Sequence, residues 1–276
     1  MAPTRLPLEL VERIIDDVAE YDVNHIDNFS SIKACALVCH CFLPLCRKYI
    51  FGSVTLKCRN EQCTSPPTSD DLNHLLSNSP HLAVYIRKLD YTVDEEEFVA
   101  ESPWLLPMFK KLVKLQKLSI ISCYWRVDKL DWMSSSERKV LLPLLHLPTL
   151  TSISLSSIQC FPLADLASCV NLKKLQIQSL GCSMRDGIGK FLEALPPTPV
   201  MLERLTIDEG SVELFQQLCH AQRPDGKPII DFSSLKKIKS RDVRLRSMTE
   251  LFGMCRNLHK INFYSMSLPH RVSSSI

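Results

Sequence analysis

Glycine is scarce in this sequence, with only 7 residues among 276, whereas a globular chain usually contains about 7% glycine. The scarcity excludes a G-x-G-x-x-G dinucleotide fingerprint, whose glycines let the backbone approach a pyrophosphate. A Walker phosphate loop is excluded as well, because Gly189-Lys190 lacks the leading glycine and the trailing Ser or Thr of that motif. The common nucleotide-binding enzyme classes therefore do not apply.

Long apolar runs and an excess of either charge are also missing. No apolar run approaches the roughly 18 residues of a membrane span, and Glu9, Glu12 and Asp16 occupy the region where a signal peptide has its apolar core. The net charge is +3, and the pI near 8.2 is below the value of about 9 typical of nucleic-acid-binding domains. We expect a soluble chain in the cytoplasm, the nucleus or both, with no nucleic-acid or membrane partner.

Motifs for metal binding and catalysis are absent too. The 12 cysteines include no C-x-x-C pair, the usual spacing of a zinc knuckle. The densest group is Cys35, Cys39, Cys41 and Cys46 around His40; we interpret it as reduced, buried small hydrophobic groups, with a metal site as the alternative. No G-x-S-x-G, H-E-x-x-H or kinase signature occurs. We predict no enzymatic activity, no cofactor and no metal.

The opening of the chain predicts an amphipathic helix. It begins at Leu6, with Pro7 in the first turn, where a missing backbone N–H is no loss. Leu10, Ile14 and Val18 then recur at helical spacing and form an apolar stripe.

Two shorter helices are predicted to follow. Ser30 or Ser31 can cap a helix that runs through Cys39, and Pro44 begins another over residues 45–50. So small a helical bundle cannot bury all of its apolar groups internally. An exposed apolar surface of this kind marks a site for a partner.

This segment resembles the F-box, in the F-box-like form common in mushroom-type fungal proteins. The matching residues are the Leu6-Pro7-x-Glu9-Leu10 opening, the Ile14-Ile15 pair and Leu37-Val38-Cys39-His40-Cys41-Phe42. His40 and Phe42 stand where the usual motif has a basic residue and a tryptophan, and the lost indole N–H favours weaker adaptor binding. We assign residues 4–52 to this domain; the alternative is a helical cap on a larger domain.

The resemblance implies that the domain docks on a Skp-type adaptor and, through it, joins a cullin–RING ligase. By analogy with F-boxes, the adaptor contacts come from Leu6, Pro7, Leu10, Ile14, Ile15, Ile32, Cys35, Val38, Cys39 and Phe42.

A repeated pattern, apolar-x-x-apolar-x-apolar, follows the helical segment. It occurs eight times, beginning at Phe51, Ile86, Leu115, Leu150, Leu172, Leu202, Leu235 and Leu258. Successive starts are 22 to 35 residues apart, and only Ser240 breaks the apolar series. This is the leucine-rich-repeat pattern, in which a short strand alternates with a helix. The asparagine or cysteine of the full motif occurs only at Cys123.

We therefore predict an α/β fold in which residues 53–276 form an irregular leucine-rich-repeat solenoid. Its parallel strands would line a concave face and its helices a convex face. Ser134 with Glu137, and Ser247 with Glu250, form capping-box patterns before helices of this region. An irregular α/β domain without true repeats is the alternative architecture.

Basic residues recur at the third position of the pattern, which faces the concave surface together with the fifth and seventh positions. The third positions are Ser53, Lys88, Lys117, Ser152, Lys174, Arg204, Lys237 and Lys260. Neighbouring strands lie about 4.8 Å apart, so these like charges repel one another unless an anionic partner relieves them. Lys239 and Arg241 thicken the row, whereas Asp90 and Asp208 interrupt it.

Two interpretations of this basic row are open. The simpler one is a solvated strand face, since lysine commonly fills exposed strand positions. The other is a docking groove for an acidic or phosphorylated peptide of a protein substrate. The candidate substrate-binding residues are Lys88, Lys117, Lys174, Arg204, Lys237, Lys239, Arg241, Lys260 and Tyr264.

An F-box followed by leucine-rich repeats resembles the substrate receptors of SCF-type ubiquitin ligases. The resemblance implies a bridge: the F-box docks on the adaptor, and the repeats hold a substrate near the charged ubiquitin-conjugating enzyme. Such a chain does no chemistry itself and acts through effective concentration and orientation. The alternative is a non-catalytic scaffold whose apolar helices pack back on the first repeats, with no ligase role. An enzyme with an unrecognised site is the third class.

Overall fold

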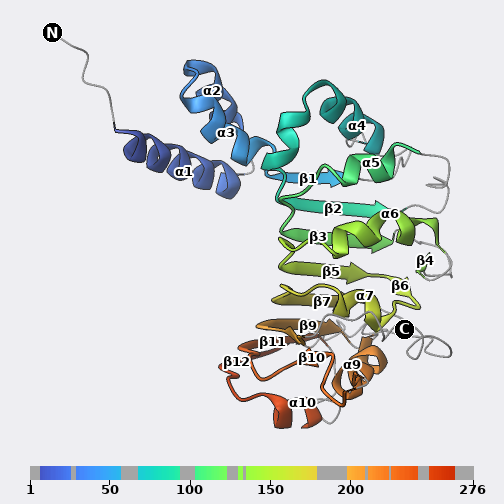
Figure 1. Ribbon diagram of the computed structural model, residues 1–276. Coiled ribbons are helices and arrows are strands. Elements are labelled where there is room, and N and C mark those ends of the chain that lie inside the picture. The colour runs from blue at the N-terminus through green and yellow to red at the C-terminus, as the bar shows by residue number, and fades with distance from the viewer. Residues whose placement is uncertain are drawn as a thin grey trace, which may run out of the picture.

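A computed structural model of the protein describes residues 7–25, 29–56, 68–93, 103–122, 130–132, 135–178, 198–208, 211–223, 225–241 and 249–264. The arrangement of its helices and strands is shown in Figure 1.

A parallel sheet of eight strands forms the centre of the molecule. In spatial order its strands are β1 (Ser53–Leu56), β2 (Lys88–Val93), β3 (Lys117–Ser122), β5 (Ser152–Ser156), β7 (Lys174–Gln178), β9 (Arg204–Asp208), β11 (Lys237–Arg241) and β12 (Lys260–Tyr264). The spatial order follows the chain order, so the sheet grows steadily from β1 to β12 (Figure 1). Each predicted repeat contributes one strand, and the predicted α/β fold with parallel strands is confirmed.

The register places equivalent positions of the repeated pattern side by side. Lys174 pairs with Ser152 on one side and with Arg204 on the other. Lys237 pairs with Arg204 and Lys260 in the same way. Burial alternates along the strands, because successive side chains point to opposite faces of a sheet. The sheet therefore has an apolar face and a polar face, which we call the polar strand face.

Helices pack on the apolar face of the sheet. They are α4 (Ser69–Asn78), the 3-10 helix η1 (Pro80–Tyr85), α5 (Leu105–Phe109), α6 (Ser136–Leu145), α7 (Leu163–Ala167), α9 (Val212–His220) and α10 (Thr249–Met254). Leu76, Phe109 and Leu141 from these helices are fully buried in one cluster with strand residues such as Leu118 and Leu155. Figure 1 shows α5 and α6 in front of the strands, so the polar strand face is turned away from them.

A partly buried ion pair ties two of these helices together, and two small sheets lie outside the eight-stranded one. These sheets pair β4 (Leu130–Asp131) with β6 (Ile158–Gln159), and β8 (Val200–Met201) with β10 (Ile230–Asp231). Arg138 of α6 donates to the Asp165 carboxylate of α7 through Nε and Nη2, both at 3.0 Å, and Trp132 Nε1 donates to it at 2.8 Å. A bidentate guanidinium thus compensates a carboxylate that is withdrawn from solvent.

The N-cap of α6 lies one residue later than predicted. Ser135 has the extended backbone of an N-cap, and its Oγ accepts a hydrogen bond from Arg138 N at 3.3 Å. Ser134 lies outside the described residues. Three consecutive serines precede Glu137, so spacing alone does not identify the capping one. The structure has a complete capping box on α4, between Thr68 and Asp71. Ser247 and Cys123 lie outside the described residues.

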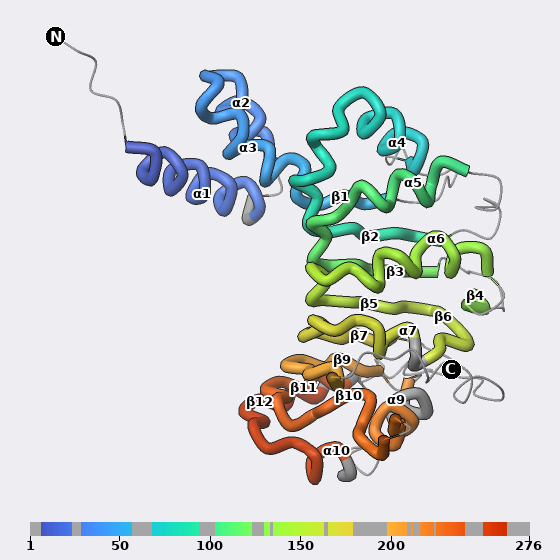
Figure 2. Tube along the Cα trace, viewed as in Figure 1, coloured from blue at the N-terminus to red at the C-terminus, as the bar shows by residue number. Residues whose placement is uncertain are grey.

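Three helices precede the sheet, as the sequence predicts (Figures 1 and 2). They are α1 (Leu8–His25), α2 (Ser30–Val38) and α3 (Phe42–Ile50). Ile15, Ala19, Ile32 and Cys46 form a small core between them, which is separate from the main core of the sheet. The N-terminal helices thus carry their own hydrophobic cluster.

The start of α2 is capped from another helix, and not by Ser30 or Ser31 as predicted. Phe29 is its N-cap residue, with φ of 58° and no side-chain capping bond. Instead, Asp22 of α1 accepts a hydrogen bond from Ile32 N at 3.0 Å. A carboxylate near a helix N-terminus is favourable because it meets free N–H groups and the positive end of the helix dipole. The third helix also differs, since it begins at Phe42 and contains Pro44 in its first turn.

Gly52 joins the helices to the sheet. A Cβ atom at this position would lie 2.2 Å from the carbonyl oxygen of Lys48 at the end of α3. The Gly52 carbonyl in turn accepts hydrogen bonds from the backbone N–H groups of Arg87 and Lys88, both at 2.9 Å. A glycine is therefore required where the chain passes from α3 into the first strand.

Ser240 provides a direct test of the packing of the apolar face. Its hydroxyl is buried without a hydrogen-bond partner among the described residues, between Ile207 and Phe263 on the adjacent strands. Ser240→Val should raise the free energy of unfolding by about 1 kcal/mol, because an unsatisfied hydroxyl is removed and apolar surface is added. Urea unfolding measures the change. Ser119→Val on the polar strand face is the matched control, expected to be neutral, and a loss of stability in Ser240→Val would contradict the packing described.

Candidate functional site

A hollow of about 180 Å³ lies on the polar strand face, across β5, β7, β9 and β11. It is lined by Ser152, Ile153, Ser154, Lys174, Leu175, Gln176, Arg204, Leu205, Thr206, Lys237 and Lys239. Four of these side chains are basic, and none carries a carboxylate. We call this feature the basic hollow.

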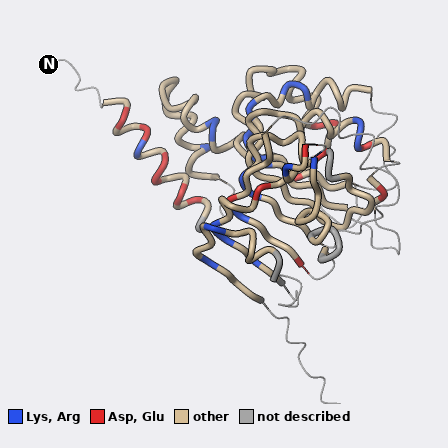
Figure 3. The backbone as a smooth tube through the Cα atoms, turned by 60° about the horizontal axis from the view of Figure 1, so that its bottom comes forward, with Lys and Arg blue, Asp and Glu red and all other residues tan. Residues whose placement is uncertain are grey.

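The strand register explains why the basic side chains meet at one place. Lys174, Arg204 and Lys237 occupy the same position on three adjacent strands, and Lys239 follows Lys237 on the same face because side chains alternate along a strand. Lys260 continues the row on β12. In Figure 3 basic positions gather at one end of the last strands, on the side of the N-terminal helices. The register therefore confirms the predicted alignment of four third-position residues: Lys174, Arg204, Lys237 and Lys260.

Glu203, which directly precedes the hollow residue Arg204, does not neutralise the hollow. Its carboxylate oxygens lie 3.6 Å and 3.7 Å from the Nζ atoms of Lys173 and Lys236 instead. Among the described residues, no carboxylate oxygen lies within 4.0 Å of the charged nitrogens of Lys174 or Lys237. Within the described part of the chain, the charges of Lys174 and Lys237 are therefore available to an anionic ligand.

The other residues predicted for the row either lie away from the hollow or have side chains outside the described residues. Lys88 forms an ion pair with Asp90 on its own strand. Lys117 is exposed on β3 and is divided from Lys174 by Ser152 of β5. The backbones of Arg241 and Tyr264 lie in β11 and β12, whereas their side chains lie outside the described residues.

A second candidate surface is apolar and lies on the N-terminal helices. Its exposed side chains are Leu10, Ile14 and Tyr21 on α1 with Leu37 and Val38 on α2. Leu8 and Val23 are also exposed but lie on other sides of α1, because the helix has 3.6 residues per turn. Leu10 and Ile14 are each about half exposed, at 51% and 49%, and Val38 is 70% exposed. We call this set the apolar helical surface.

The predicted stripe of α1 is divided between the core and this surface. Ile15 and Val11 point inward, and so does Ile32 of α2, which is fully buried beside Ile15. Ile15 and Ile32 therefore cannot contact an adaptor in this structure, which corrects their placement among the contact residues. They hold the helices together, because burial of side chains of this size contributes roughly 1.5–3 kcal/mol each.

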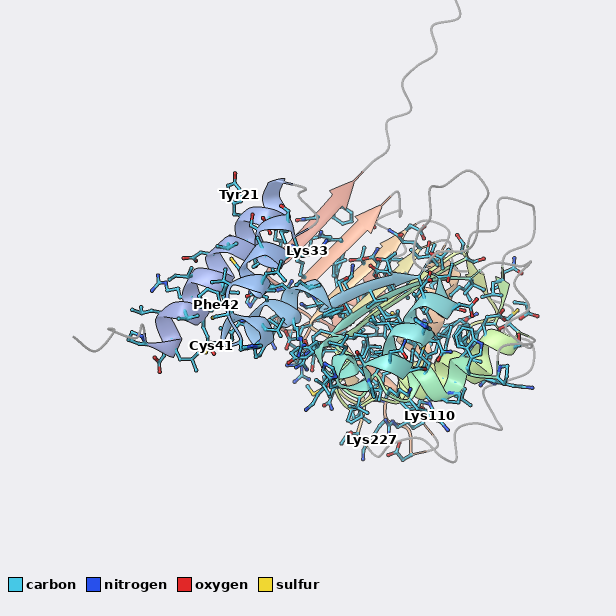
Figure 4. All side chains as sticks on the ribbon, turned by 90° about the horizontal axis from the view of Figure 1, so that it is seen from above. Tyr21, Lys33, Cys41, Phe42, Lys110 and Lys227 are labelled. Atoms are coloured by element: carbon cyan, nitrogen blue, oxygen red, sulfur yellow. The ribbon has the colours of Figure 1, made fainter. Side chains whose placement is uncertain are left out.

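Those of the other predicted adaptor contacts that the structure describes are at least partly accessible. Pro7 and Cys39 are exposed, and Cys35 and Phe42 are partly buried. Leu6 lies outside the described residues. The hydrogen bond from Ile32 N to the Asp22 carboxylate places the start of α2 near the C-terminal half of α1. Figure 4 shows Cys41 and Phe42 towards the other end of α1, away from Tyr21.

The cysteine group of the N-terminal helices is only partly a packing feature. Cys46 is buried, and burial raises the pKa of its thiol. Cys39 and Cys41 are exposed at the turn between α2 and α3, so their interpretation as buried hydrophobic groups is wrong. A turn places its side chains in solvent whatever their polarity. Within the described residues, no three His, Cys, Asp or Glu side chains are arranged to hold a metal ion.

A few accessible residues were not predicted as site residues. Ser154, Gln176 and Thr206 line the basic hollow, and their fifth position in the repeated pattern carried this information. Tyr21 and Leu37 are exposed members of the apolar helical surface. Tyr21 lies eleven positions after Leu10, which brings it back to the same side of a helix of 3.6 residues per turn.

The two surfaces are suited to binding. The basic hollow offers charge together with hydroxyl and amide groups, and the apolar helical surface offers side chains that a partner would remove from water. Comparison with models of known protein families gives no match to this chain, and no curated protein matches it. In the described part of the chain, no helix combines the length and the apolar character that crossing a membrane needs.

Proposed function

We propose that this chain is the substrate-recognition subunit of an SCF-type ubiquitin ligase. In this proposal α1–α3 act as an F-box-like domain that docks on a Skp-type adaptor. The sheet and its helices act as an irregular leucine-rich-repeat solenoid whose strand face binds a protein substrate. The chain itself catalyses nothing and brings the substrate to the ligase in the cytoplasm or nucleus.

The apolar helical surface is the observation that carries the adaptor half of the proposal. Leu10, Ile14 and Val38 belong to the motif that resembles an F-box, and their side chains remain open to solvent. Ile15 and Ile32 hold the helices that present them. Exposed aliphatic side chains on a helical unit with its own core favour association with another protein.

The basic hollow supports the substrate half of the proposal. Lys174, Arg204 and Lys237 lie side by side without a compensating carboxylate among the described residues. Bringing an acidic or phosphorylated peptide into the hollow would replace the repulsion between these charges by attraction. Lysine commonly fills exposed strand positions, but a merely solvated strand face offers nothing to offset the repulsion between basic residues on four consecutive strands.

The exposure of α1 weighs against the scaffold alternative. A scaffold of that kind would use its apolar helices to cover the first repeats. Leu10 and Ile14 are instead about half exposed, at 51% and 49%. The hydrophobic cluster of the helices is also distinct from that of the sheet.

Co-expression with a fungal Skp-type adaptor tests this function. The two proteins should elute together in size-exclusion chromatography, and light scattering should give one adaptor for each chain. The chain alone should bind a hydrophobic dye, and the adaptor should abolish that signal because it covers the apolar helical surface. A chain that stays free of the adaptor would refute the ligase assignment.

A further inference from the structure

The last strand of the sheet exposes side chains that every interior strand buries. Ile261 and Phe263 of β12 are 41% and 46% exposed. At the equivalent positions of β11, Ile238 and Ser240 are 0% and 1% exposed. The same positions of β9, Leu205 and Ile207, are both 1% exposed. The apolar face of the sheet is therefore open at its β12 end.

The backbone of β12 is open at the same edge. β12 pairs with β11 on one side and is the last strand in the sheet order. Within the described residues, no strand pairs with its other side, and Figure 1 shows β12 as the outermost strand of the stack. An edge strand with free N–H and C=O groups and exposed apolar side chains is a template for pairing with another strand.

We propose that β12 pairs with β12 of a second copy of this chain, so that two sheets join into one across a two-fold axis. The strands would run antiparallel, with Asn262 opposite Asn262 of the second copy. Ile261 then lies opposite Phe263 of the second copy, and Lys260 opposite Tyr264 of the second copy. All residues of both strands are paired in this register.

The symmetry follows from the two faces of the sheet. Antiparallel pairing about an axis normal to the sheet keeps the apolar faces of both copies on the same side, so Ile261 and Phe263 meet apolar partners. Pairing about an axis along the strands would turn one sheet over and place those side chains beside the basic row. Antiparallel pairing also separates Lys260 from its copy, whereas parallel pairing sets like charges opposite each other.

The partner is a second copy because the other end of the sheet has less apolar surface to offer. Leu56 of β1 is only 2% exposed, although it occupies the same position in the pattern as Phe263. A head-to-tail contact between β12 and β1 would therefore leave Ile261 and Phe263 poorly matched. A contact of the β12 end with itself is self-complementary, as closed two-fold dimers require.

Light scattering of the full chain over a series of concentrations tests the proposal. We expect a dimer at a protein concentration of about 100 μM that dissociates into monomers on dilution to about 1 μM, as is typical of a small interface. Phe263→Lys should weaken the dimer by at least about 10-fold. Ile121→Lys is the matched control, because Ile121 is also partly exposed, at 38%, but lies on the interior strand β3. A monomer at every concentration would overturn the proposal, and so would a dimer that Phe263→Lys does not weaken.

A cysteine at the two-fold axis tests the register without altering the apolar face. In a background with Cys39→Ser and Cys41→Ser, Asn262→Cys should form a disulfide with its copy, because directly opposite Cα atoms in antiparallel strands are about 4.5–5.5 Å apart. Lys260→Cys should not, since its copy would lie about 13 Å away along the strand. Peptide mapping identifies the linked residues. Equal cross-linking of both variants would contradict the register. Adaptor binding should be unchanged in Phe263→Lys, which leaves the N-terminal helices intact.

Discussion

Replacing Leu10 and Ile14 together by aspartate is expected to abolish co-purification of the Skp-type adaptor. Both side chains are about half exposed on α1, and we expect them to be hot spots of the interface, where truncating one side chain costs about 2 kcal/mol or more. Two such changes predict an affinity loss of at least about 100-fold. A pull-down with tagged adaptor, followed by titration calorimetry, measures it.

The control must separate loss of binding from loss of folding. Val113→Asp adds a charge to an exposed apolar position outside the N-terminal helices, at 49% exposure, and should leave adaptor binding intact. Circular dichroism should show unchanged helix content for the Leu10 and Ile14 variant, because Ile15 and Ile32 still form the core between the helices. An adaptor that still co-purifies with the folded variant would show that the apolar helical surface is not the docking site.

Reversing the charge of the basic hollow is expected to abolish capture of an acidic substrate peptide. The change replaces Lys174, Arg204 and Lys237 by glutamate on three adjacent strands. A labelled oligo-glutamate peptide and its phosphoserine-containing counterpart serve as probes, with binding followed by fluorescence anisotropy. We expect an affinity loss of at least about 100-fold for either probe, because attraction becomes repulsion at several short distances.

The salt dependence and a charge-matched variant make this prediction specific. Binding to the native chain should weaken as salt is added, since ions screen exposed charges over about 8 Å at physiological ionic strength. Lys110→Glu, Lys111→Glu and Lys139→Glu together make the same change in net charge at exposed positions outside the hollow. They should retain most of the affinity. Equal losses in both triple variants would mean that the net charge of the protein, and not the hollow, attracts the peptide.

The strand part of the fold could be predicted from the sequence because its signal is local. Each pattern repeat has its apolar residues at fixed spacing, so Leu118 and Ile120 had to face the same side of a strand whatever surrounded them. Alignment of the repeats then predicted the neighbours of Lys174 and Lys237, which the register confirms. The same rule places the fifth-position residues Ser154, Gln176 and Thr206 on this face, although they were not predicted as site residues.

The helical part needed the tertiary structure. The apolar residues of α1 cover more than one side of the helix, so periodicity did not decide whether Ile14 or Ile15 faces the core. Packing against α2 and α3 decided it, and Ile15 is buried whereas Ile14 is about half exposed, at 49%. The cap of α2 depended on Asp22, ten residues before Ile32, which no local capping pattern includes.

By itself, the sequence determined the alternation of strands and helices, the parallel sheet and the identity of the row of basic residues, because a period of two residues assigns each side chain to a face. Only the tertiary structure decided which basic side chains line one hollow, which apolar side chains of α1 remain in solvent, and that the sheet is open at Ile261 and Phe263. Those properties depend on the neighbours that a residue acquires from distant parts of the chain, and the free energy of burial is set by those neighbours and not by the residue type alone.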